Sequence, residues 1–167
     1  GLYTRGVNDP NWQSVVFALQ KIGQTDFIVG GLSALELKGF SHYLPNSKGG
    51  TIHLYGNDKL PVWTKGIILT DFFIRHTRTS LFAEMDKPLS EKYTVSFPWK
   101  DRMEGLKIST PERACLEMLD QVPNIISFEH ANQLIQGMTT LSPKALQQLL
   151  EMCTNIKVKR LFLWFAK

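Results

Sequence analysis

Cysteine and long apolar runs are both scarce in this sequence. Only two of the 167 residues are cysteines, Cys115 and Cys153, and both fall on the apolar side of an expected helix. We therefore expect two buried thiols, and neither a disulfide nor a metal site. No apolar stretch approaches the roughly 20 residues that a membrane span needs, and the first residues lack the pattern of a signal peptide. These absences predict a cytoplasmic protein without membrane contact.

Recognisable catalytic motifs are also missing. The sequence has no Gly-x-Ser-x-Gly, no P-loop and no cysteine paired by motif with a histidine. The turn Gly30–Ser33 precedes a helix whose free N–H groups could bind a phosphate, as in nucleotidyltransferases. Such enzymes also need a pair of carboxylates shortly afterwards to hold metal ions, and this pair is missing. We therefore interpret the two glycines as a turn that permits close packing. No catalytic residue, cofactor or metal ion is expected.

One spacing keeps an enzymatic alternative open. Asp26, Glu36 and Lys38 imitate the acid…acid-x-Lys arrangement of metal-dependent nucleases. The match is weak, because Glu36 and Lys38 fall on an expected helix, where such enzymes use a strand. The four histidines show no metal-ligand spacing and are each expected at the surface or half-buried: His42, His53, His76 and His130.

Overall composition is that of a globular protein, with 43% hydrophobic and 20% charged residues and a net charge of +4. All 15 acidic residues precede Met152, whereas four of the 19 basic residues follow it. Such a basic end can contact nucleic acid, although a solvated helix face is an equal alternative. The candidate nucleic-acid-binding residues are Lys157, Lys159 and Arg160.

Hydrophobic periodicity predicts the strands in the first two thirds of the chain. After a helix capped by the stretch Asn8–Asn11, we expect strands at 27–29, 51–55, 67–76, 93–97 and 106–108. In the second of these, Ile52 and Leu54 alternate with His53 and Tyr55, so we expect the latter two on a wet face.

The chain is organised around the stretch 108–119, where a strand end runs directly into a helix. Ser109 or Thr110 can cap that helix, and Pro111 suits its first turn. If Ser109 is the cap, Glu112 can bond back to it in a capping box. We interpret three charged residues of this helix as a cap and an exposed surface pair: Glu112, Arg113 and Glu117.

The last third is expected to be helical. One helix begins at Ile126 or Ser127 and ends near Gly137, and Ser142-Pro143 starts a second. A final helix carries Val158, Leu161, Phe162 and Phe165 on its inner side. The sequence thus predicts an α+β fold, in which a small central sheet from the middle third is flanked by helices and followed by a helical C-terminal third.

Several blocks, taken together and in order, resemble one family. Their order along nearly the whole chain makes the resemblance much more specific than any single block. The blocks are Val29–Gly39 with His42–Leu44, Leu60–Trp63, Ser109–Glu117, Leu141–Pro143 and Lys157–Leu163. They resemble the AbiEi-type antitoxins of bacterial type IV toxin–antitoxin, or abortive infection, systems.

This resemblance implies a non-enzymatic antitoxin that opposes a nucleotidyltransferase toxin without a stable complex. It also implies a regulator that binds the promoter DNA of its own operon, mainly through an N-terminal winged helix. Residues 1–6 resemble only the tail of that winged-helix domain, and 7–167 would be the antitoxin domain, cut short at its C-terminal end. Besides the nuclease, a domain that homodimerises through its C-terminal helices is the remaining alternative.

Overall fold

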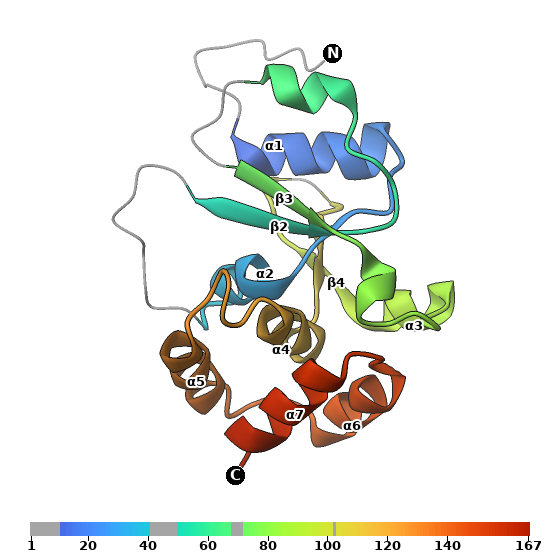
Figure 1. The fold of residues 1–167 in the computed structure, drawn as a ribbon. Coiled ribbons are helices and arrows are strands. Elements are labelled where there is room, and N and C mark those ends of the chain that lie inside the picture. Colours follow the sequence, from blue (N-terminus) through green and yellow to red (C-terminus); the bar gives the residue numbers. More distant parts are fainter. Residues whose placement is uncertain (1–10, 41–49, 68–71, 102) are drawn as a thin grey trace.

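The computed structural model describes residues 11–40, 50–67, 72–101 and 103–167, which form a layered α+β fold. Figure 1 shows α1 on one face of the sheet and α2 and α4 on the other, with α5, α6 and α7 beyond α4. The predicted fold class is therefore confirmed. The expected winged-helix remnant at 1–6 lies outside the described residues.

The sheet has five strands in the order β3-β2-β1-β5-β4. Strand β1 pairs antiparallel with β2 and parallel with β5, while β2–β3 is parallel and β4–β5 antiparallel. The strands are β1 (Ile28–Val29), β2 (Thr51–Tyr55), β3 (Phe72–His76), β4 (Thr94–Phe97) and β5 (Leu106–Ser109). Because β1 lies at the centre, the sheet unites an early segment of the chain with its middle third.

Seven α-helices surround this sheet in the described ranges. Helix α1 continues as a π-helical turn, η1 (Ala18–Ile22), and short 3-10 turns occupy Val62–Gly66 and Arg78–Ser80. The helices are α1 (Trp12–Phe17), α2 (Gly31–Leu37), α3 (Lys87–Lys92), α4 (Pro111–Asp120), α5 (Phe128–Gly137), α6 (Pro143–Met152) and α7 (Ile156–Phe165).

Local chemistry fixes most helix starts as predicted. The side chains of Asn11, Ser127 and Ser142 each accept a hydrogen bond from a backbone N–H of the first turn. In helix α4 the cap is Thr110, one of the two predicted candidates, but its side chain does not make the expected cap hydrogen bond. The predicted Ser109–Glu112 capping box is therefore wrong.

Two strand predictions also need correction. His53 and Tyr55 are buried, so β2 has no wet face. The strand lies between β1 and β3 with helices on both faces of the sheet, and polar side chains of β2 are therefore enclosed like apolar ones. The strand expected at 67–76 is observed at Phe72–His76; Ile67 lies outside it, and 68–71 lies outside the described residues.

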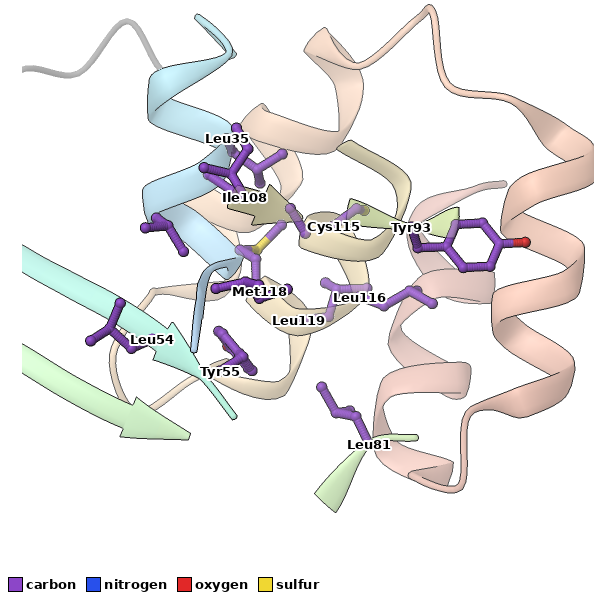
Figure 2. Packing of buried hydrophobic residues seen from close by; sticks show 14 of the residues in the cluster. Leu35, Leu54, Tyr55, Leu81, Tyr93, Ile108, Cys115, Leu116, Met118 and Leu119 are labelled. Atoms are coloured by element: carbon purple, nitrogen blue, oxygen red, sulfur yellow. The ribbon is translucent and has the colours of Figure 1, made fainter. Parts of the chain in front are cut away.

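Helix α4 is the centre of the core. It is buried on all sides from Arg113 to Leu119, because α2 and the sheet cover one side while α5, α6 and α7 cover the other. Figure 2 shows its side chains gathered among residues of α2, of the sheet and of the segment around Leu81. Cys115 and Cys153 are both buried free thiols, as predicted.

Candidate functional site

The most unexpected feature of the molecule is a buried ion pair inside α4. Arg113 Nε lies 3.5 Å from Glu117 Oε2, and each side chain is only 1% exposed. The prediction of an exposed surface pair is therefore wrong. The i,i+4 spacing was identified correctly, but such spacing is the same on a wet helix and on an enclosed one.

Outside the pair, Arg113 finds only weak partners for its buried charge among the described residues. Arg113 Nη1 reaches the carbonyl oxygen and hydroxyl of Ser90 in α3 at 3.5 and 3.4 Å, which are long contacts for a charged donor. Burial raises the pKa of the Glu117 carboxyl, and the guanidinium of Arg113 opposes that rise. Burial also lowers the pKa of Arg113, against the effect of Glu117. Each charge therefore depends on the other for its place in the core.

Glu117 also holds the start of α2. Its Oε1 accepts a hydrogen bond from the Gly31 backbone N–H at 3.3 Å, and its main-chain carbonyl accepts one from the Tyr55 hydroxyl at 3.3 Å. A Cβ on Gly30 would lie 2.6 Å from a Tyr55 ring carbon and 2.7 Å from Glu117 Oε1. Gly31 adopts φ +54, the left-handed region that favours glycine. The interpretation of Gly30-Gly31 as a close-packing turn is confirmed.

The third charged residue of this helix, Glu112, serves another contact. Its Oε1 accepts a hydrogen bond from the Ser142 backbone N–H at 2.9 Å. Glu112 thus ties the first turn of α4 to the start of α6 and does not bond back to its own helix. The local spacing of a capping box gave no sign of this partner, which lies 30 residues away.

A pair of histidines, of which His53 is buried and His76 half-buried, crosses the outer part of the sheet. His53 Nδ1 and His76 Nε2 are 2.8 Å apart, and the His76 ring stacks on Tyr55 with centroids 4.6 Å apart. The expectation of surface or half-buried histidines is wrong for His53, which is buried, and confirmed for His76 and His130. His42 lies outside the described residues.

Burial is the main cause of the altered titration of this pair. It lowers the pKa of His53 to about 4, with the neighbouring His76 adding to the shift. Burial also lowers the pKa of His76, although Asp120 acts against that change. The head-on geometry of two ring nitrogens requires one donor and one acceptor, so the pair is neutral when it is hydrogen-bonded in this way.

Polar contacts continue from the histidines to the start of α7. His76 Nδ1 lies 3.4 Å from Gln121 Nε2, which is 3.3 Å from Asp120 Oδ2. Asp120 Oδ1 in turn accepts a hydrogen bond from Asn155 Nδ2 at 2.9 Å. Since Asn155 caps α7, the end of α4 connects the sheet with the beginning of the last helix.

The three candidate nucleic-acid-binding residues lie on α7 but are not equivalent. Lys157 Nζ donates to the carbonyl oxygens of Asp120 at 2.7 Å and Val122 at 3.1 Å. It therefore caps the C-terminal end of α4, where a positive charge is favourable. Lys159 is half-buried and Arg160 is exposed. Lys157 is exposed as well, but its ammonium group already binds these two carbonyl oxygens.

The residues of the nuclease alternative have structural partners or surface positions. Asp26 accepts hydrogen bonds from the backbone N–H groups of Asn57 and Asp58 at 2.8 and 3.0 Å, which holds the turn after β2. Glu36 and Lys38 are exposed at the end of α2. Within the described ranges, no three His, Cys, Asp or Glu side chains gather closely enough to hold a metal ion.

Sequence comparison places this architecture in a family. A family model described as a transcriptional regulator, the AbiEi antitoxin of a type IV toxin–antitoxin system, matches residues 49–167. A second model, for the N-terminal domain of the AbiEi antitoxin, matches residues 1–46. The chain belongs to the AbiEi antitoxin family. The search of curated proteins found no significant match.

The two AbiEi models meet between residues 46 and 49, yet the described fold crosses that point. Strand β1 lies within the 1–46 match, and its two neighbours in the sheet, β2 and β5, lie within the 49–167 match. No helix in the described part of this AbiEi chain is long and apolar enough to cross a bilayer. The burial of the Arg113–Glu117 pair and the His53–His76 contact were not predicted from the sequence, because the elements that enclose these residues come from distant parts of the chain.

Proposed function

We propose that this chain is the antitoxin of a bacterial type IV pair, that it opposes a nucleotidyltransferase toxin, and that it represses its own operon. The observation that carries the proposal is the match of two AbiEi models, which together extend over residues 1–46 and 49–167. The chain acts in the cytoplasm and without catalysis. Its effect on the toxin does not require a stable complex.

The antitoxin role is tested by rescue of growth. The nucleotidyltransferase encoded beside this gene is induced in cells that carry either this chain or an empty vector. We expect growth to resume only in cells that carry the chain. Arrest that persists although the chain is well expressed and folded would refute the antitoxin role. A Glu36→Ala variant distinguishes the nuclease alternative, because magnesium-dependent cleavage that this variant loses would identify an enzyme.

The regulatory role is tested with DNA that contains the chain's own promoter. We propose that Lys159 and Arg160 add contacts to the DNA backbone. Their place on α7 supports this proposal, because the segment 152–167 that contains the helix has no acidic residue. Replacing both by Ala should weaken binding and reduce the salt dependence by about 0.9 per lost phosphate contact. Lys144→Ala on α6, which removes an exposed cation from a neighbouring helix, is the matched control.

Lys157 provides an internal contrast in the same assay. Because its ammonium group already binds two carbonyl oxygens at the end of α4, we expect Lys157→Ala to lower stability more than DNA affinity. Promoter binding that is unchanged in the Lys159→Ala/Arg160→Ala variant would assign these side chains to a solvated helix face.

A further inference from the structure

A row of polar side chains connects the sheet with the start of α7 by way of the end of α4. His53 Nδ1 lies 2.8 Å from His76 Nε2, and His76 Nδ1 lies 3.4 Å from Gln121 Nε2. Gln121 Nε2 donates to Asp120 Oδ2 at 3.3 Å, and Asn155 Nδ2 donates to Asp120 Oδ1 at 2.9 Å. We call these five residues the His76 network. It joins β2 and β3 to the residue that caps α7.

The carboxylate in the His76 network fixes the hydrogen-bond role of each ring nitrogen. An ionised carboxylate only accepts hydrogen bonds, so the Gln121 amide presents its NH2 group to Asp120 Oδ2. The same NH2 group faces His76 Nδ1, which therefore accepts and carries no proton. The proton of the neutral His76 ring is on Nε2, from which it is donated to His53 Nδ1.

Of the two histidines, His76 is the one open to solvent, because it is half-buried whereas His53 is buried. Burial lowers the pKa of His76, and the Asp120 carboxylate opposes that change. His53 and Tyr55 face the His76 ring from β2, and Asp120 faces it from α4. Lys157 of α7 approaches the same carboxylate, with its Nζ 3.9 Å from Asp120 Oδ1. As the pH falls, His76 therefore takes up a proton before His53, and the proton binds at Nδ1.

We propose that His76 is a proton-operated switch for the first turn of α7. Once its Nδ1 carries a proton, it can no longer accept from Gln121, and the amide turns so that its oxygen faces the imidazolium. Asp120 then loses the donor at its Oδ2 and is drawn toward the cation, away from Asn155. Because Asn155 Oδ1 accepts from the Val158 backbone N–H as the cap of α7, the first turn of this helix opens at low pH.

The effect of this switch is local. The turn that it opens contains Lys157 and directly precedes Lys159 and Arg160, so a fall in pH loosens the cationic part of α7. Helix α4 stays folded, because its middle is enclosed on all sides. The switch does not rest on the proposed antitoxin or DNA-binding roles, and it is measured without toxin or DNA.

The experiment is amide hydrogen exchange of the full chain, followed by NMR at pH 7.5 and pH 5 and expressed as protection factors, which removes the intrinsic pH dependence of exchange. We expect the protection factors of the Val158 and Lys159 amides to fall at least about tenfold at pH 5, because both amides donate to Asn155. Equal protection at the two pH values overturns the proposal. An equal fall at Leu116, in the core of α4, would be global unfolding and overturns it as well.

Two variants interrupt the His76 network at different points. His76→Asn keeps an acceptor for Gln121 that does not titrate, and Gln121→Leu removes the group that turns. In both variants, which circular dichroism must show to be folded, we expect the protection factor of Val158 to change less than about threefold between the two pH values. The matched control is His130→Gln, at a half-buried histidine of α5, which should keep the wild-type response. A wild-type response in either His76→Asn or Gln121→Leu overturns the proposal.

NMR of the ring nitrogens in the wild-type chain provides a measurement that needs no variant. At pH 7.5 we expect both His53 and His76 to carry their proton on Nε2, and His76 to take up a second proton on Nδ1 as the pH falls toward 5. A neutral His76 ring with its proton on Nδ1 overturns the proposal, because Gln121 cannot donate to a protonated nitrogen.

Discussion

The backbone N–H of Gly31 donates to Glu117 Oε1 across 3.3 Å, although 86 residues separate the two in sequence. This contact joins the first residue of α2 to the middle of α4. It also places the Glu117 carboxylate between the Gly30-Gly31 turn and the Arg113 guanidinium. Two of the sequence blocks that carry the family resemblance therefore meet in one buried contact.

Removing the carboxylate from this contact should be strongly destabilising. We expect Glu117→Ala to lower the free energy of unfolding by about 3–5 kcal/mol, because Arg113 would remain buried without its counter-charge. Urea denaturation measures the change. The control is Glu84→Ala at an exposed position, which should cost less than about 0.5 kcal/mol. The double variant Arg113→Met/Glu117→Leu should be more stable than Glu117→Ala, because it leaves no unpaired charge in the core. A double variant as unstable as Glu117→Ala would contradict charge compensation as the reason for the loss.

Close packing at the turn makes a second prediction. Gly30→Ala places a methyl group within 2.7 Å of both the Tyr55 ring and the Glu117 carboxylate, and should lower the free energy of unfolding by about 1–3 kcal/mol. The matched control is Gly137→Ala, where a Cβ meets nothing within 4 Å and stability should stay equal or rise by up to about 1 kcal/mol. Equal effects in the two variants would contradict the close-packing role.

Helices α4 and α6 both begin with a proline, but they should respond differently when the cap residue before that proline is replaced by Ala. Ser142 Oγ accepts a hydrogen bond from the Ala145 N–H at 3.3 Å, so Ser142→Ala should lower the free energy of unfolding by about 1 kcal/mol. Thr110 makes no side-chain cap bond, and Thr110→Ala should therefore cost less than Ser142→Ala. Thermal melting of both variants checks the order, and a larger loss for Thr110→Ala would contradict it.

The contact of buried His53 with half-buried His76 makes stability depend on pH. In the folded chain the pKa of His53 is lowered from 6.5 to about 4, so the unfolded chain takes up this proton first as the pH falls. The contribution of neutral His53 is complete above pH 6.5 and is lost as the pH falls from 6.5 to about 4. At about 1.4 kcal/mol for each pH unit, the full loss is about 3 kcal/mol.

Urea denaturation at several pH values measures this effect against a His53→Phe variant. The variant should show a shallower decline in stability between pH 6.5 and 4, because it lacks the proton that the unfolded wild type binds there. His130→Gln serves as a control for a histidine in α5, outside the sheet. An identical slope in wild type and His53→Phe would show that His53 is not protected from protonation by the fold.

Local chemistry explains which elements could be predicted. A helix start can be predicted where a short polar side chain reaches the free N–H groups of the first turn, because no distant partner is involved. This is the case at Asn11, Ser127 and Ser142. The predictions that were wrong concern residues whose environment comes from elsewhere in the chain. His53 and Tyr55 alternate with apolar residues like a wet strand face, but β3 and the helical layers enclose them.

Four properties could be predicted from the residues alone: the order of most elements, the α+β class, the burial of both cysteines and the family that the ordered blocks resemble. Periodicity, caps and short motifs are local properties, so they can be read without coordinates. Three contacts depend on how distant elements pack and were not predicted: Arg113 and Glu117 are enclosed, Glu112 bonds to the start of α6, and Lys157 caps α4. A charged side chain has the same local pattern in water and in a core, and only the layers packed around it determine which one it occupies.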